Sequence, residues 1–490
     1  MITQALETRK KGLALALLCV AQFMVVLDFS IVNIALPSMQ KDLGLSTQNL
    51  QWIISAYSLT FGGFLLLGGR MGDLYGRRKL FIAGLFLFSL ASLAGGLAIS
   101  GVWLIITRGV QGLGAAFIAP TALSLITTTF AEGPERNKAF GVVGAMASLG
   151  FAVGAILGGI LTAGPGWRWV MFVNVPIGFV LLILTPIVLT ESKVESEERH
   201  IDILGAILVT TGLIALVYAL AQGNTLGWTS YTTLGLLVVA VVLLTAFVFV
   251  ELRTREPLVR LSIFKQRSIT GANLISFLAP GVFGSFIFIL TLYMQKVLGY
   301  SAIQTGLGFL PLAFVILIFS NITARLVSRI GVKRILIMGL STTAVGMLLF
   351  LGLSENGSYL PTILPGMLVV GLGMGPTFGT MVIAATDGVK DEEQGLASGV
   401  FNTTQQVGSG LILAIITAIS AAQTALVLQG GGQMKSALVG GSIYALVGCA
   451  VFDAIAVVIA IVVLRGNKNV VLKIDDVIGE EREVMGPLAR

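Results

Sequence analysis

The feature that most constrains the fold is a series of fourteen long apolar runs separated by short polar segments. A helix that spans a bilayer needs about 20 mainly apolar residues, and each run approaches or exceeds that length. Only 11% of the 490 residues are charged, whereas about 25% are charged in a soluble domain. The runs are too long and too continuous for the alternating strands of a membrane β-barrel. The sequence therefore predicts an all-α integral membrane protein.

The expected helices occupy residues 13–36, 50–69, 80–99, 102–129, 138–162, 169–190, 203–221, 231–250, 269–293, 304–324, 335–353, 360–385, 397–421 and 440–464.

The basic residues predict how these helices are oriented. With a cytoplasmic N-terminus, the inner segments hold clusters such as 70–79 and 325–334. The outer loops hold four basic residues, namely Lys41, Arg168, Lys296 and Lys435. Because Lys and Arg accumulate in cytoplasmic loops, we expect a multi-pass protein of the cell membrane with both termini in the cytoplasm.

Composition also excludes several classes of function. The net charge of +7 comes from residues between apolar runs and not from a separate basic domain, so nucleic acid is not expected as a partner. One histidine and two cysteines provide no metal cluster or disulfide framework. A GxxxxGK[ST] phosphate loop and a nucleophile–base set are both missing from the sequence. We therefore expect neither an enzyme nor a protein with a cofactor, metal or ATP site.

Two basic segments resemble each other and suggest an internal repeat. GRMGDLYGRRKLF (69–81) aligns with ARLVSRIGVKRIL (324–336), so that Gly76 matches Gly331 and Arg78 matches Lys333. AFGVVG (139–144) similarly matches ASGVFN (397–402). The alternative is chance similarity between loops rich in Gly and Arg. A repeat predicts four parts, namely a six-helix half (1–190), two extra helices (191–268), a second six-helix half (269–465) and a tail (466–490).

Four stretches make the chain similar to the major facilitator superfamily, in particular to its fourteen-helix drug:proton antiporters. They are LDFSIVNIALP (27–37), GGRMGDLYGRRKL (68–80), LIITRGVQGLGAAF (104–117) and GFAVGAILGGIL (150–161). The resemblance implies a major facilitator fold with 14 helices (6 + 2 + 6) whose halves alternate access to a central cavity. It also implies multidrug efflux driven by proton entry. One departure is Ala155, which stands where the family pattern has proline.

Asp28 and Arg108 are charges within predicted spans. A charge at the centre of a bilayer costs roughly 2.5–3.5 kcal/mol on insertion scales, so such residues are functional candidates. The resemblance implies that both take part in proton coupling, with Asp28 as the proton carrier. For Arg108 the alternative is that its side chain extends to the membrane surface. Asp453 also lies within a predicted span, and there a position beside a neighbouring helix or lipid is the alternative.

Two glycine-containing motifs add further candidates. The resemblance implies a conformational latch at Gly69, Asp73, Gly76, Arg77, Arg78 and Lys79. A loop that only sets the orientation would explain its arginines, but not Asp73 with its flanking glycines. The fifth run carries small residues that suit close helix packing, namely Gly150, Gly154, Gly158 and Gly159. Ordinary packing without a role in antiport is the alternative there.

The scarcity of acids within the spans indicates the substrate class. One carboxylate in the expected cavity suits a lipophilic monocation or a neutral amphiphile. The candidate lining residues are Tyr57, Gln111, Phe117, Tyr293, Asn402 and Gln406, with Phe29, Phe286, Met374 and Phe378 as further apolar candidates. Helix packing is the alternative for each one.

The leading hypothesis from the sequence is a bacterial proton-coupled exporter that acts as a monomer in the lipid bilayer. Export of an endogenous lipid, antibiotic or metabolite on the same scaffold is the alternative. A receptor or scaffold that does not transport is less favoured, because it needs neither an intramembrane Asp nor a repeated latch.

Overall fold

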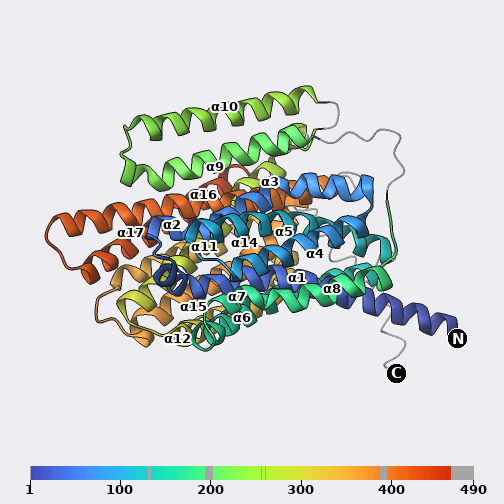
Figure 1. Cartoon of the computed structure of the whole chain (residues 1–490), viewed down its shortest axis with the longest axis horizontal. Helices are drawn as coiled ribbons and strands as arrows, with labels where there is room; N and C mark the ends of the chain where they lie inside the picture. Colours follow the sequence, from blue (N-terminus) through green and yellow to red (C-terminus); the bar gives the residue numbers. More distant parts are fainter. Residues whose placement is uncertain are drawn as a thin grey trace.

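The computed structural model describes residues 2–130, 134–193, 202–254, 257–259, 261–386 and 394–464, and these residues are almost entirely helical (Figure 1). In this part, 13 helical segments are long and apolar enough to cross a membrane. A further helix contains the shorter apolar stretch Leu149–Ala163. Together they match the predicted runs one for one, which confirms the all-α fold with fourteen spans.

The helices of the N-terminal half are α1 (Ile2–Leu43), α2 (Thr47–Leu50), α3 (Trp52–Tyr75), α4 (Arg77–Gly96), α5 (Gly101–Thr129), α6 (Pro134–Ala163), α7 (Arg168–Phe172) and α8 (Asn174–Val188). Within this half, α5 packs between α3 and α4, and α1 packs along α6. The two segments α7 and α8 together form one span, Arg168–Val188.

The segments of the C-terminal half are η1 (Leu261–Lys265), α11 (Arg267–Leu292), η2 (Tyr293–Val297), α12 (Ala302–Gly308), α13 (Leu310–Ile330), α14 (Val332–Leu348), η3 (Leu349–Gly352), η4 (Tyr359–Ile363), α15 (Leu364–Thr386), α16 (Gln394–Gln429) and α17 (Met434–Val462). Helix α11 packs against α16 and α17, while α15 packs between α13 and α14. Pro311 at the start of α13 lacks a backbone N–H, which fits the break between α12 and α13 at Phe309.

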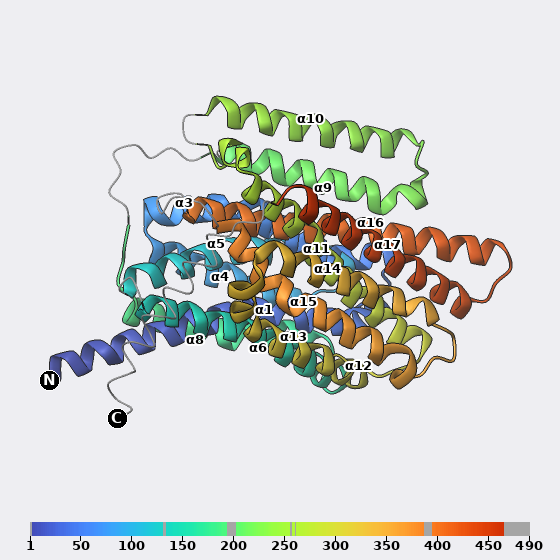
Figure 2. The ribbon, with the colours of Figure 1, turned by 180° about the vertical axis from the view of Figure 1, so that it is seen from behind.

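The two extra helices, α9 (Ile203–Leu226) and α10 (Tyr231–Arg253), form a hairpin on one side of the bundle (Figures 1 and 2). Helix α9 contacts α3 of one half and α16 of the other, whereas α10 lies outside it and packs along α9. Polar contacts join α9 to both halves. Gln222 donates to Asn49 Oδ1 at 2.8 Å, and Asn224 donates to the Ala418 carbonyl at 2.8 Å. The hairpin therefore spans the boundary between the halves.

The two aligned basic residues make the same contact in each half. Arg78 donates to the carbonyls of Pro186 and Leu189 at 3.4 and 3.0 Å, near the end of α8. Lys333 donates to those of Ile461 and Leu464 at 2.6 and 2.8 Å, at the end of α17. The last carbonyls of a helix lack partners within it and attract cations. This shared contact, with the same spacing of three residues, is what an internal repeat predicts.

Candidate substrate cavity and buried charge network

A cavity of about 1320 Å³ lies between the two halves. Its walls come from α1, α3, α5 and α6 on one side and from α11, α13, α15 and α16 on the other. It extends to the end of the bundle that carries the 69–79 loop, where Arg70, Asp73 and Arg136 line it. We call this end the basic end. Typical ligand pockets measure about 300–1,000 Å³, so the cavity has room for a drug-sized molecule.

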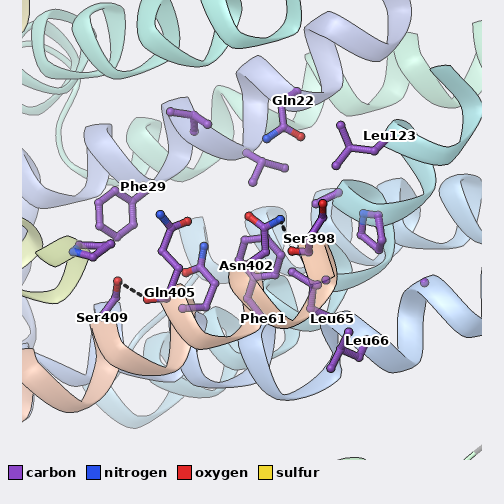
Figure 3. A pocket seen from close by; sticks show the side chains of 18 of the residues that line it. Gln22, Phe29, Phe61, Leu65, Leu66, Leu123, Ser398, Asn402, Gln405 and Ser409 are labelled. Atoms are coloured by element: carbon purple, nitrogen blue, oxygen red, sulfur yellow. Dashed lines mark hydrogen bonds between the residues drawn. The ribbon is translucent and has the colours of Figure 1, made fainter. Parts of the chain in front are cut away.

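The middle of the cavity combines aromatic rings with amides. Phe283 packs against Phe151 and Phe378, with ring centroids 5.8 and 5.6 Å apart. Polar side chains on α16 recur every three or four residues and so share one helix face. This polar stripe consists of Ser398, Asn402, Gln405, Gln406 and Ser409. Figure 3 shows four of its members, with Phe29 and Gln22 of α1 nearby.

Charged side chains in the lining are confined to the basic end. They are Arg70, Asp73, Arg77, Arg136 and Asp202. The deeper lining consists of neutral polar and apolar groups. A molecule bound there would meet aromatic surface and hydrogen-bonding amides but no carboxylate.

Three of the six predicted lining residues, Tyr57, Asn402 and Gln406, lie on the cavity wall, as do Phe29 and Phe378. The other three lie elsewhere, and so do Phe286 and Met374. Gln111, Tyr293 and Phe117 are each held by another contact. Gln111 donates to Asp28, and Tyr293 donates to the Ser354 carbonyl at 2.7 Å. Phe117 packs beside Gly68 and Gly84. Gln405 is a lining residue that sequence reasoning missed, although its spacing from Asn402 could have revealed it.

Asp28 lies in a fully buried hydrogen-bonding network inside the N-terminal half. One carboxylate oxygen, Oδ2, pairs with Arg108 at 2.5 Å. The other, Oδ1, accepts hydrogen bonds from Gln111 at 2.7 Å and Asn174 at 2.8 Å. Gln111 in turn donates to the Ser92 hydroxyl at 2.8 Å. A buried carboxylate is tolerated when paired and hydrogen-bonded in this way.

Arg108 uses its guanidinium in several directions. It pairs with Asp28 and also donates to Gln111 Oε1 at 2.6 Å and to the Ile53 carbonyl at 3.0 Å. It also lies over the Tyr57 ring, 4.4 Å from the centroid. Only 1% of its side chain is exposed, so Arg108 does not extend to the membrane surface.

The network lies beside the cavity and not within its lining. Neither Asp28 nor Arg108 lines the cavity, which differs from the expectation that the acid lies inside it. The reason is that Asp28 faces donors on α5 and α8 of its own half. Tyr57 belongs to both regions, because it contacts Arg108 and lines the cavity. Asn174 was missed, although a lone amide in the apolar stretch VMFVNVPIG (170–178) was a usable signal.

The predicted latch residues gather at the basic end. Asp73 pairs with Arg77 at 2.8 Å. Gly76 has φ of 113° between α3 and α4, a conformation that favours glycine. Glu191 accepts hydrogen bonds from the backbone N–H groups of Arg78 and Lys79 at 3.0 and 3.2 Å.

These contacts attach the segment after α8 to the start of α4. A Cβ atom at Gly76 would lie 2.8 Å from the Glu191 carboxylate, so glycine leaves room for this contact. Gly69 lies near Pro120 of α5. Sequence reasoning missed Glu191, whose carboxylate occupies the positive end of a helix dipole.

The four glycines of α6 have two different neighbours. Gly150, Gly154 and Gly158 lie against α1, where a Cβ would come within 3.1 Å of a backbone oxygen at each position. Gly159 instead lies against α12 of the other half, and a Cβ there would be 2.8 Å from the Ala302 carbonyl oxygen.

At Gly306 of α12, a Cβ would be 2.3 Å from the Ala155 carbonyl oxygen. Gln295 also donates to the Ile34 carbonyl at 3.0 Å. These contacts join the two halves at the end opposite the basic end.

Asp453 is a second fully buried acid, on α17. Neither of its carboxylate oxygens has a hydrogen-bond partner among the described residues. It therefore differs from Asp28, which is paired. Within the same part of the chain, no group of three or more His, Cys, Asp or Glu side chains could hold a metal ion.

Comparisons with known proteins agree with this architecture. A family profile described as Major Facilitator Superfamily matches residues 18–413. The chain is 41% identical to the puromycin resistance protein pur8 of Streptomyces alboniger, over 88% of this chain and 86% of that protein. It is 38% identical to the cephamycin export protein CmcT of Amycolatopsis lactamdurans, over 85% and 87%. It is 34% identical to the multidrug resistance protein Stp of Mycobacterium tuberculosis (strain ATCC 25618 / H37Rv), over 87% and 78%.

Among solved structures, the fold is similar to a bacterial homolog of the human lysosomal transporter Spinster, in an inward-facing and unoccupied conformation. The TM-score is 0.63 at 16% sequence identity, and the match covers 92% of this chain and 96% of that one. At this identity the likeness concerns the fold alone.

Proposed function

Because the chain belongs to the major facilitator superfamily and resembles its drug-efflux transporters throughout, we propose that it exports amphiphilic, antibiotic-like molecules in exchange for protons. The proton gradient, and not ATP hydrolysis, drives export in this proposal. The observation that carries it is the buried Asp28–Arg108 pair, which contacts the wall of a large central cavity through Tyr57.

The cavity chemistry supports a substrate that is a neutral amphiphile or a lipophilic monocation. Its aromatic rings provide apolar surface and can also attract a cation. The polar stripe on α16 can orient hydroxyl, amide and carbonyl groups of the substrate. The three curated relatives named above carry antibiotic or multidrug names, and this agrees with the proposed class.

Proton coupling would act through the charge pair. A proton on Asp28 removes the negative charge that faces Arg108, so the guanidinium loses its strongest partner. Arg108 lies over Tyr57, and Tyr57 lines the cavity. A change at Asp28 can therefore reach the substrate through this ring without direct contact between proton and substrate. Coupling would then be conformational, and not a competition for one carboxylate.

The side on which the cavity opens follows from the expected orientation. If the basic end is cytoplasmic, the cavity extends to the cytoplasmic end and the contacts of α6 with α12 close the outer end. This is the inward-facing arrangement of an alternating-access transporter. Substrate would enter from the cytoplasm or the inner leaflet and leave after the halves rock.

The test is transport by the purified protein in liposomes with an imposed pH gradient. We expect Asp28→Asn to abolish gradient-driven export of lipophilic cations and neutral amphiphiles. Substrate binding should be largely retained, because Asp28 does not line the cavity. Asp42→Asn is the matched control, since Asp42 lies on the same helix in an exposed pair with Arg168 and such pairs contribute about 0–1 kcal/mol.

A second variant separates lost coupling from lost folding. Asp28→Asn leaves Arg108 buried without a counter-charge, which destabilises by about 3–5 kcal/mol. The double variant Asp28→Asn/Arg108→Gln removes both charges and should fold while remaining uncoupled. Gradient-driven export that persists in this folded double variant would rule out the proposed role of Asp28.

A further inference from the structure

The basic end of the α9–α10 hairpin contributes to the cavity wall. Asp202 precedes α9, and Pro257 and Leu258 follow α10, and all three line the cavity near its basic end. Leu258 packs with Leu67 of α3 and Ala206 of α9. The two extra helices, α9 and α10, thus help to form the cavity mouth, which is the opening of the cavity at the basic end.

Two carboxylates lie buried at this place. Asp202 is 8% exposed and caps α9, because its Oδ1 accepts the Gly205 N–H at 2.7 Å. Glu251 is 4% exposed and lies near the end of α10, where its Oε2 accepts the Val259 N–H at 3.1 Å. Each acid therefore uses one oxygen to hold local backbone.

Asp202 Oδ2 and Glu251 Oε1 are both buried without a hydrogen-bond partner among the described residues. The two carboxyl groups interact with each other where the start of α9 meets the end of α10. Two carboxylate oxygens can only accept, so a hydrogen bond between them requires a proton. Two ionised carboxylates side by side would repel each other strongly in buried surroundings.

Among the residues that the structure describes, no charged group replaces this proton. On α10, the Arg253 guanidinium lies 3.9 Å from the centroid of the Phe249 ring. On α3, Asp73 pairs with Arg77, and Arg70 lies on the cavity wall. Within the described ranges, no salt bridge reaches Asp202 or Glu251. The start of α9 adds no other charge, since residues 203–210 are apolar apart from Thr210.

We propose that Asp202 and Glu251 form a proton-binding site that holds one proton between two carboxyl groups at the cavity mouth. The proton fastens the start of α9 to the end of α10 and so fixes Leu258 on the cavity wall. When the proton is released, both carboxylates are negative and repel each other, which loosens this corner of the hairpin. The site is distinct from Asp28 and belongs to the extra helices.

The experiment is an infrared titration of the purified protein in lipid nanodiscs without substrate. We expect a carbonyl band of a protonated carboxyl group that disappears as the pH rises. This titrating band should be missing in both Glu251→Gln and Asp202→Asn, and should remain in Asp28→Asn and Asp453→Asn. A separate carboxyl band from the uncharged Asp453 should be lost in Asp453→Asn alone. Because the readout does not involve transport, its outcome is independent of whether the chain exports drugs.

The two variants are chosen so that the protein still folds. Asn caps a helix about as well as Asp, and in Glu251→Gln the side-chain carbonyl can still accept the Val259 N–H. The side-chain amide introduced by Glu251→Gln also supplies the missing donor to Asp202 at every pH. Thermal stability of the wild type should therefore fall as the pair loses its proton at rising pH, whereas that of Glu251→Gln should not.

Two results would overturn the proposal. The first is a titrating carboxyl band that is unchanged in both variants, which would mean that another acid holds the proton. The second is the absence of any titrating carboxyl band in the wild type, which would mean that the pair does not exchange a proton.

Discussion

Asp28 and Asp453 are both fully buried acids on spanning helices, but only Asp28 has polar partners. Around Asp28, an arginine and two amides supply donors to both carboxylate oxygens. Around Asp453, the described residues supply none. An unpaired ionised carboxylate is costly in such a place, so Asp453 fits better as an uncharged group.

This contrast predicts different effects of the same substitution. Asp453→Asn replaces the acid with a neutral group of similar shape. It should leave export unchanged and the free energy of unfolding within about 1 kcal/mol of wild type. Asp28→Asn should abolish gradient-driven export. The measurement is the liposome assay together with a melting curve of each variant. Loss of proton coupling in a folded Asp453→Asn protein would instead make Asp453 part of the proton pathway.

Sequence reasoning identified both acids but not their surroundings. A charge in an apolar run is visible locally, and so Asp28, Arg108 and Asp453 could all be found. Whether such a charge is paired depends on contacts between distant segments. Asn174, for example, is 146 residues from Asp28 along the chain. This is why Gln111 was predicted on the cavity wall and is found in the charge network.

At the scale of single elements, α6 packs against two different helices with neighbouring faces. Gly150, Gly154 and Gly158 hold α6 close to α1 within one half, whereas Gly159 meets α12 across the boundary between halves. In the proposed alternating-access cycle, the contact of α6 with α1 persists while the halves rock. The contact of α6 with α12 must break whenever the cavity opens at the end opposite the basic end.

Gly159→Ala should therefore shift the conformational equilibrium. A Cβ there overlaps the α12 backbone, and overpacking costs about 1–3 kcal/mol, or about 5- to 150-fold in population. We expect a larger distance between spin labels at Ile99 and Asn356, which are exposed in one loop of each half at the closed end.

Gly141→Ala is the matched control on the same helix, because a Cβ there meets nothing within 4 Å. It should leave the label distance unchanged and gain at most about 1 kcal/mol of helix propensity. Equal distances in both variants would show that Gly159 does not control closure.

Helix existence was predictable because the length of an apolar run is a local property. The ends were less so: α1 covers Ile2–Leu43 and α6 begins at Pro134, since helices continue into polar segments beyond the apolar run. The break at Phe309 and the short η segments were also not predicted. They depend on packing against other helices, which a run of apolar residues does not encode.

At the scale of the whole molecule, two features give the bundle a direction. The charged part of the cavity lining lies at the basic end, and the contacts between α6 and α12 lie at the other end. The distribution of Lys and Arg predicts that the basic end is cytoplasmic.

Labelling with a membrane-impermeant maleimide tests this orientation. Ile99→Cys lies at the closed end and should react in intact cells, whereas Lys138→Cys, exposed at the start of α6, should react only after permeabilisation. The two native cysteines, Cys19 and Cys449, are buried and should contribute little background. The reverse pattern would place the basic end outside.

The polar stripe also has an evolutionary consequence. Ser398, Asn402, Gln405, Gln406 and Ser409 all lie on one helix, α16, whereas the Asp28 network lies in the opposite half. On the proposed function, substitutions along a single helix face would change which molecules are recognised without altering the proton-coupling network. One scaffold would then diversify by point mutation, and a lineage would acquire a new resistance while its coupling residues stay unchanged.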